Sequence, residues 1–141
     1  MHEVRLDTAR GELAALRGGR AGGPPLLCLH GWLDNAASFL PLAPHLADFD
    51  WAMLDLPGHG ASAHRAPGHD YAFVDWIHDV LDALDALRWP RAHLLGHSMG
   101  AIASLIIAGS FPQRVTHLAL IDGVIPPTDK GENAAERMGM A

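Results

Sequence analysis

Four short apolar runs, each ending in a glycine or a polar residue, constrain the fold of this chain more than any other feature. They occupy residues 26–29, 51–54, 92–95 and 115–121. Short continuous apolar runs are typical of strands that are buried on both faces of a parallel sheet. Because helical patterns separate the runs, we expect an α/β fold with helices on both faces of a mostly parallel sheet. In such folds ligands bind at the carboxyl edge of the strands, where the polar residues of this chain gather.

Two of the connecting segments have the pattern of helices. In residues 71–87 apolar side chains recur at steps of three and four, and residues 99–110 are apolar nearly all round, which indicates a buried helix. The first of these helices also carries three aspartates on one face. With no second element converging on them, we expect a solvated face and not a metal site; they are Asp75, Asp79 and Asp82.

The N-terminal part of the chain is less regular. Two short apolar segments flank the turn-prone residues 9–11 and predict an antiparallel hairpin at one edge of the sheet. Residues 18–25 contain four glycines and two prolines and predict a loop. Residues 35–46 begin as a helix that their two prolines are expected to break or restart.

Composition excludes several classes of function. The 141 residues fit one domain, and 49% are hydrophobic and 18% charged, which argues against disorder. The net charge is −6 with no basic patch, so we expect no nucleic-acid partner. Every apolar run is far shorter than the ~20 residues of a membrane span, and the N-terminus lacks the pattern of a signal peptide. We therefore expect a cytoplasmic protein without a membrane partner.

No cofactor or metal is expected either. The chain has no glycine-rich nucleotide-binding motif after its first buried run. Three histidines lie close together in the sequence, but their loop lacks the spacing of metal ligands; they are His59, His64 and His69. The single cysteine, Cys28, excludes an internal disulfide, and its apolar surroundings predict a buried, unreactive thiol.

The segment Gly96-His97-Ser98-Met99-Gly100 joins the third apolar run to the second helix. Gly-x-Ser-x-Gly in that position predicts a sharp turn that strains the serine backbone and exposes its hydroxyl, with glycines where side chains would collide. The alternative is an ordinary strand-to-helix turn in which the serine caps the helix. The first interpretation makes Ser98 a nucleophile that attacks a carbonyl carbon.

Acyl transfer through a serine also requires a base, a group that orients the base, and two donors for the oxyanion. The backbone N–H of Met99 is the first candidate donor, and that of Trp32, in the loop after the first buried run, is the second. The Trp32 ring either lines the acyl pocket or simply packs. We expect His30 to brace its loop and His97 to pack, so neither is the expected base.

Four motifs together resemble the α/β-hydrolase superfamily, in particular its serine hydrolase-like members. The resemblance covers nearly the whole chain in collinear order through HGWLDNAASF (30–39), DLPGHGASAH (55–64), LLGHSMGA (94–101) and FPQRVTHLALID (111–122). It implies that the strands before Trp32 and Ser98 are neighbours in the sheet. It also implies a small-molecule ester or other acyl substrate, no cofactor, a core over residues 1–122 and the start of a cap over 123–141.

The resemblance leaves the proton-transfer residues unaccounted for. In this fold the catalytic residues follow the order serine, acid, histidine. The one histidine after Ser98 is His117, which lies inside a predicted strand. Asp122 follows that strand and is a candidate acid, although we favour a structural role for it, with the acid lying beyond residue 141.

We therefore interpret the chain as the N-terminal half of a truncated α/β-hydrolase fold that is inactive alone, with the last strand, 115–121, as an exposed apolar edge. The alternative is a non-catalytic fragment, or a pseudoenzyme that binds ligands. Haloalkane dehalogenases and epoxide hydrolases are disfavoured, because these relatives carry aspartate where this chain has Ser98.

Overall fold

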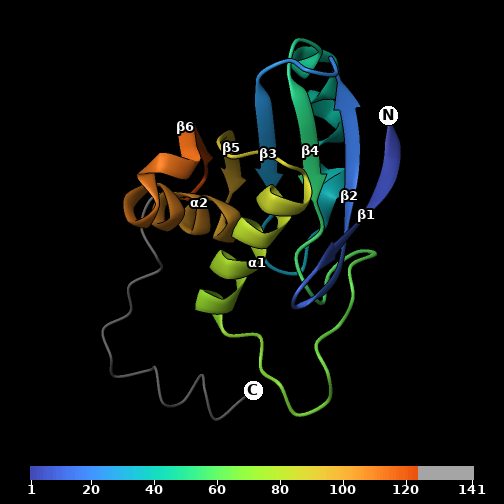
Figure 1. The fold of residues 1–141 in the computed structure, drawn as a ribbon, viewed down its shortest axis with the longest axis vertical. Coiled ribbons are helices and arrows are strands. Elements are labelled where there is room, and N and C mark those ends of the chain that lie inside the picture. The colour runs from blue at the N-terminus through green and yellow to red at the C-terminus, as the bar shows by residue number, and fades with distance from the viewer. Residues whose placement is uncertain (124–141) are drawn as a thin grey trace.

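A six-stranded sheet forms the centre of the molecule (Figure 1). The computed structural model describes residues 1–123. The strands lie in the order β1-β2-β4-β3-β5-β6. Strands β3 to β6 are mutually parallel, while β1 and β2 form an antiparallel hairpin at one edge, as the sequence predicts. Their bounds are β1 (His2–Thr8), β2 (Gly11–Gly19), β3 (Pro25–Leu29), β4 (Asp50–Leu54), β5 (Ala92–His97) and β6 (Val115–Ile121).

Helices cover both faces of this sheet, which confirms the expected α/β fold. Helices α1 (Phe73–Ala86) and α2 (Met99–Ser110) pack on one face. The 3-10 helix η1 (Ala36–Leu46) lies on the other, and a short 3-10 turn, η2 (Pro112–Arg114), precedes β6. No helix in residues 1–123 is long and apolar enough to span a membrane.

Alternation along the central strands creates two apolar cores. Leu27 and Leu29 of β3 face α1 and α2, whereas Cys28 between them faces η1. Cys28 is fully buried, and desolvation raises the pKa of its thiol to about 12. The predicted buried, unreactive cysteine is therefore confirmed, since the thiolate is the reactive form.

Two expectations about the N-terminal region were wrong in detail. The segment 18–25 is not all loop, because Gly18 and Gly19 still belong to β2 and pair with β4. A Cβ on Gly18 would lie 2.3 Å from the ring of Trp51, so the glycine makes room for an aromatic ring. The prolines of η1 also do not interrupt it: the chain avoids an α-helix and continues as one 3-10 helix past Pro41 and Pro44.

The three aspartates of α1 are not a uniformly solvated face. Asp79 is 1% exposed, and its Oδ2 accepts a hydrogen bond from Arg65 at 2.7 Å. Burial raises the pKa of the Asp79 carboxyl, although the neighbouring Arg65 guanidinium acts to lower it. The expectation failed because the Arg65 side chain, from the loop before α1, pairs with Asp79 across 14 residues of sequence. The helix pattern alone does not contain that information.

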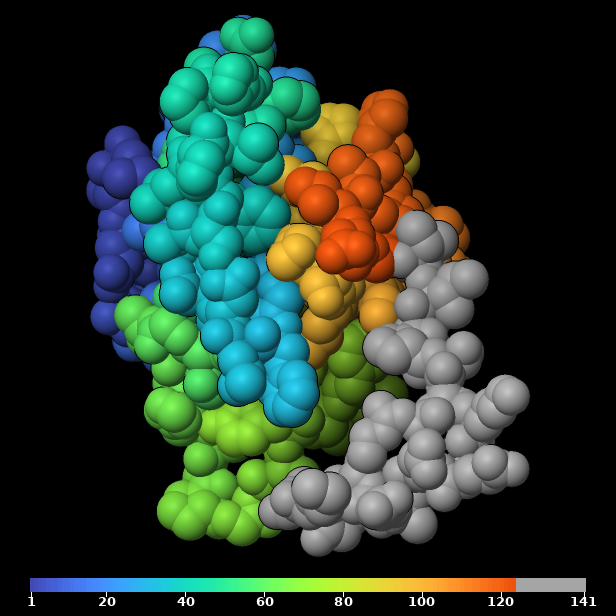
Figure 2. Space-filling model, turned by 180° about the vertical axis from the view of Figure 1, so that it is seen from behind, coloured from blue at the N-terminus to red at the C-terminus, as the bar shows by residue number. Residues whose placement is uncertain are grey.

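Beside η1, the sheet is incompletely covered within the described part of the chain. Figure 2 shows η1 over one side of this face, with the segments of β5 and β6 visible beside it. A cavity of about 600 Å³ lies here between the end of η1 and the two strands. Its lining is mainly apolar and includes Leu46, Phe49, Leu95 and Leu118.

Candidate active site

The turn between β5 and α2 holds Ser98 in a strained conformation. Its φ is 51° and its ψ is −116°, a region that L-residues rarely occupy. A Cβ on Gly96 would lie 2.4 Å from the Gly100 carbonyl oxygen, and one on Gly100 would lie 2.1 Å from the Leu29 oxygen. Both glycines are therefore sterically required. The Ser98 side chain makes no capping hydrogen bond to the helix, which speaks against the simple capping interpretation.

The loop after β3 packs directly against this turn. Strands β3 and β5 are parallel neighbours, with Leu29 opposite Gly96. A Cβ built on Gly31 would lie 3.3 Å from the Ser98 Cβ. The predicted neighbourhood of the two loops is thus present in the structure. Within residues 1–123, neither the N–H of Trp32 nor that of Met99 donates a hydrogen bond to another protein group. Two free donors near a serine are what stabilisation of an oxyanion requires.

His30 is buried inside this loop and cannot serve Ser98 as a base. Its Nε2 accepts a hydrogen bond from the Leu56 N–H at 3.0 Å, so its proton lies on Nδ1. That proton faces the Gly31 carbonyl oxygen at 2.6 Å. Burial lowers the pKa of His30, which keeps the ring neutral. Both ring nitrogens are thereby occupied in holding the loop, the role that the sequence suggests.

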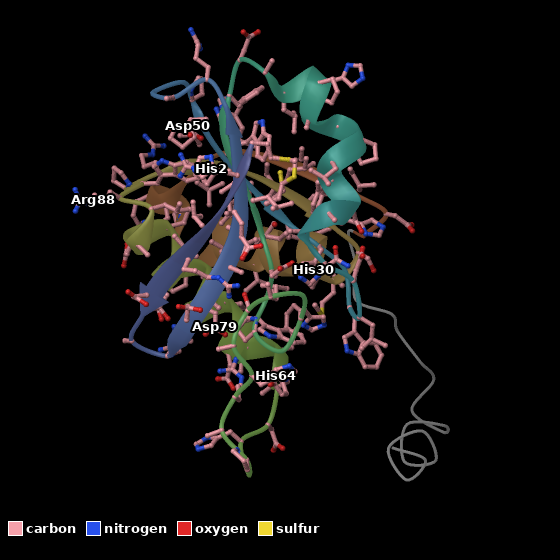
Figure 3. All side chains as sticks on the ribbon, turned by 90° about the vertical axis from the view of Figure 1, so that its right-hand side faces the viewer. His2, His30, Asp50, His64, Asp79 and Arg88 are labelled. Atoms are coloured by element: carbon pink, nitrogen blue, oxygen red, sulfur yellow. The ribbon has the colours of Figure 1, made fainter. Side chains whose placement is uncertain are left out.

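A cavity of about 610 Å³ opens next to the Ser98 turn. The first residue after the serine, Met99, reaches this cavity, and the Trp32 side chain stands at its side, 69% exposed. Figure 3 shows His30 near the middle of the molecule and His64 below it, both on the side away from Asp50, where β4 begins. The lining is mainly aromatic and apolar: Trp32, Leu33, Gly58, His59, His64, Tyr71, Trp76 and Met99. None of these residues carries a permanent charge.

In the described part of the chain no histidine is hydrogen-bonded to Ser98. All ten histidines lie within residues 1–123, and none makes a hydrogen bond with the serine. His97 lines a different cavity, together with Asp34 and Ser38. His117 stacks on His93 at 4.6 Å between ring centroids, and these two line the cavity beside η1.

Asp122 follows Ile121, which is hydrogen-bonded to Ser98, but within residues 1–123 it has no histidine partner. It follows β6 with a φ of 48°, and its carboxylate makes no hydrogen bond within the described residues. The next residue, Gly123, approaches Ser98 so closely that a Cβ there would lie 2.6 Å from the serine carbonyl oxygen. The cap is predicted over residues 123–141. All of it except Gly123 lies outside the described residues.

Sequence reasoning missed two residues that shape the site. Asp55 accepts hydrogen bonds from the N–H groups of Ala36 and Ala61, at 2.7 and 2.9 Å, and so joins η1 to the loop after β4. His59 accepts a hydrogen bond from the Leu33 N–H at 3.1 Å. Both belong to the motif at 55–64, whose glycines and histidines are visible in the sequence but whose long-range partners are not.

Comparison with known proteins agrees with the observed fold. The alpha/beta hydrolase fold family matches residues 24–141. A serine hydrolase-like protein from Homo sapiens is 41% identical over 123 residues, which is 85% of this chain and 60% of that protein. The crystal structure of a hypothetical protein from Pseudomonas aeruginosa PAO1 superposes with a TM-score of 0.89 at 50% identity, covering 99% of this chain and 49% of that one.

A thioesterase domain from the curacin biosynthetic pathway superposes with a TM-score of 0.85 at 25% identity, over 99% of this chain and 52% of that domain. The chain thus spans 60% of the length of the human relative and about half of the two solved structures. The matched family, the identity to serine hydrolase-like proteins and the observed sheet agree: the chain belongs to the α/β-hydrolase family.

Proposed function

We propose that this chain is the nucleophile-bearing part of a serine hydrolase that acts on an ester or another acyl substrate. The observation that carries the proposal is the strained Ser98 turn, with Gly31 packed against it and the N–H groups of Trp32 and Met99 free. The family relationship supports hydrolase chemistry in general. The role of these three residues is our inference from the geometry.

In the proposed reaction, the Ser98 Oγ attacks the carbonyl carbon and loses its proton to a base. The carbonyl oxygen becomes an oxyanion that accepts hydrogen bonds from the N–H groups of Trp32 and Met99. Collapse of this intermediate expels the leaving group, which takes up a proton, and leaves an acyl ester on Ser98. Water then attacks the ester, releases the acid and restores the serine.

Within residues 1–123 none of the ten histidines makes a hydrogen bond with Ser98, so we infer that a group outside these residues supplies the base. We therefore expect activity in the full-length protein and not in residues 1–141 alone. In a serine protease of unrelated fold, loss of the catalytic histidine lowers turnover by about 10⁶-fold.

The cavity beside Ser98 supports an uncharged small-molecule acyl substrate. Its lining residues provide aromatic and apolar surface without a lysine, an arginine or a carboxylate. A volume of about 610 Å³ lies in the usual range for small-molecule sites. Among the structural relatives, the curacin domain is named as a thioesterase, so a thioester is one acyl group to test.

A fluorophosphonate probe tests the proposed nucleophile on the full-length protein. We expect covalent labelling that disappears in Ser98→Ala, because the probe reacts with an activated serine hydroxyl. Ser110→Ala is the matched control, since Ser110 is exposed at the far end of the same helix. Labelling that persists in Ser98→Ala would contradict the proposal, whereas Ser110→Ala should label as the unaltered protein does.

A non-catalytic binding protein is the second candidate, and the lack of a contacting histidine favours it. The coding sequence beyond codon 141 separates the two candidates. An aspartate or glutamate followed by a histidine in frame supports the hydrolase. An authentic stop codon, with an unlabelled but ligand-binding protein, supports the second.

A further inference from the structure

The loop that carries the proposed Trp32 donor contains a residue in an unfavourable backbone conformation. Leu33 has a φ of 58°, in the left-handed region that favours glycine. Its side chain is 79% exposed, so burial does not compensate for this conformation. One hydrogen bond closes the turn that contains Leu33, from the Asp34 N–H to the Gly31 carbonyl oxygen, and its length of 3.3 Å is long. Another interaction must hold the loop.

That interaction is the hydrogen bond from the Leu33 N–H to His59 Nε2, at 3.1 Å. The other ring nitrogen, Nδ1, lies 3.1 Å from the Pro57 carbonyl oxygen. A carbonyl accepts and an N–H donates, so His59 carries its proton on Nδ1 and offers a lone pair at Nε2. The two contacts are satisfied together only by this neutral tautomer.

Ring packing also fixes the orientation of His59. Its ring centroid lies 5.1 Å from that of His30 and 5.7 Å from that of Trp76, which is 5% exposed. Gly58, the residue before it, has a φ of 78° and lies close to the Tyr71 ring. The acceptor at Nε2 is therefore held in place before any ligand arrives.

Each of the two peptide groups that flank Trp32 is held by a histidine. His30 Nδ1 contacts the Gly31 carbonyl oxygen, which belongs to the same peptide group as the Trp32 N–H. In a planar trans peptide the C=O and N–H point in opposite directions, so this contact also sets the direction of the Trp32 N–H. The following peptide group ends in the Leu33 N–H, which His59 holds.

We propose that His59 is a positioning residue: through its Nε2 it fixes the peptide group after Trp32 and so restricts rotation of the Trp32 backbone, whose N–H is the proposed oxyanion donor. This inference rests on the proposed function for the purpose of the positioned N–H, whereas the contact itself is independent of catalysis. His59 does not exchange a proton with substrate. Its tautomer matters because a donor at Nε2 would face the donor of Leu33.

The first test measures the contact in the full-length, ¹⁵N-labelled protein by NMR. We expect the His59 ring to carry its proton on Nδ1 and the Leu33 amide to exchange slowly with solvent. His59→Gln keeps an acceptor near the Nε2 position, whereas His59→Phe keeps a ring without an acceptor. Leu33 exchange in His59→Phe should be about tenfold faster than in His59→Gln, the factor expected for one hydrogen bond.

Two results would overturn the inference at this stage. One is a His59 ring protonated on Nε2 in the unaltered protein. The other is equal Leu33 exchange in His59→Phe and the unaltered protein. If His59→Phe fails to fold, His59→Asn replaces it, because asparagine can still donate toward Pro57 but cannot reach Leu33. His2→Gln is the control histidine, exposed at the start of β1, the edge strand of the sheet.

The second test measures hydrolysis of p-nitrophenyl butyrate by the full-length protein. A misdirected oxyanion donor lowers kcat more than it changes KM, so His59→Phe should lower kcat by about tenfold or more with KM within about twofold. His59→Gln should stay within about threefold of the unaltered protein. Equal kcat values in His59→Phe and His59→Gln would refute positioning through Nε2. Absence of Ser98-dependent hydrolysis would refute the proposed function instead, and the exchange measurement would still decide the His59 contact.

Discussion

Ser98 owes its conformation to the two glycines that flank it. A methyl group on Gly100 would overlap the backbone of β3 and His30, and backbone atoms cannot move aside as a flexible side chain can. Further along α2, a side chain in place of glycine would meet no such steric conflict. Gly109, in the same helix, has open space around its Cα. Steric demand therefore decides what Gly100 contributes, whereas helix propensity decides at Gly109.

From this contrast we predict opposite effects of one substitution at two positions. Gly100→Ala should lower the free energy of unfolding of the full-length protein by about 3 kcal/mol or more, because the added methyl group overpacks a rigid backbone. Gly109→Ala should lower the free energy of unfolding much less than Gly100→Ala does, or should raise it by about 0.5–1 kcal/mol, since alanine is the better helix former. Denaturant unfolding compares the two. Similar losses in both variants would contradict the steric explanation.

His30 makes stability depend on pH. Burial lowers its pKa in the folded protein below the ordinary value of about 6.5. The unfolded chain therefore binds more protons in the range below 6.5, and protonation favours unfolding. We expect the His30 contribution to be complete above that value and to fall as the pH drops through it. His93, whose pKa burial also lowers, adds a change of the same sign.

Comparing denaturant midpoints at pH 7.5 and 5.5 isolates the part that belongs to His30. His30→Gln should be less stable at pH 7.5 and should lose less stability on acidification than the unaltered protein does. An unchanged pH dependence in this variant would assign the effect to the other histidines.

At the scale of elements, buried polar contacts attach the loops to the sheet. Asp55 joins the start of η1 to the loop after β4, and Arg65 joins the following loop to α1 through Asp79. The Arg65 side chain is 13% exposed and that of Asp79 is 1% exposed. Removing one partner of such a pair leaves the other buried and uncompensated, which is more harmful than removing both.

A double-mutant cycle on this pair tests its role. Arg65→Met should destabilise the full-length protein by about 3 kcal/mol, and Arg65→Met combined with Asp79→Leu should recover a large part of the loss. Urea unfolding of the two single variants, the double variant and the unaltered protein gives the interaction energy. Additive losses would show that the pair is not coupled.

For the whole molecule, the strands and the edge hairpin follow from the sequence more readily than the contacts at the site do. Runs such as 26–29 and 51–54 are apolar because they are buried inside the sheet, and that pattern is local. The sequence signal for the strained Ser98 turn is also local, because the two flanking glycines predict it. The Leu33 contact with His59 is not: 26 residues separate the partners, and only the folded sheet brings them together.

The apolar surface near β6 leads to a prediction for the isolated 141-residue chain. Leu105, Ile106 and Ile121 are exposed, and the cavity beside η1 is mainly apolar. Apolar patches and free strand edges promote association. We expect residues 1–141 to bind the dye ANS and to self-associate in sedimentation velocity, unlike the full-length protein. A monomer that does not bind the dye would show that this surface is covered.

The backbone N–H of Ser98 donates a hydrogen bond to the carbonyl oxygen of Ile121, the last residue of β6. Among the described strands β6 is the outermost on its side, and edge strands open most easily in local fluctuations. The backbone of the proposed nucleophile is therefore held in place by an edge strand, which opens more easily than the central strands do. A further strand or another molecule that pairs with the free side of β6 would therefore also restrict the motion of Ser98, without touching the serine.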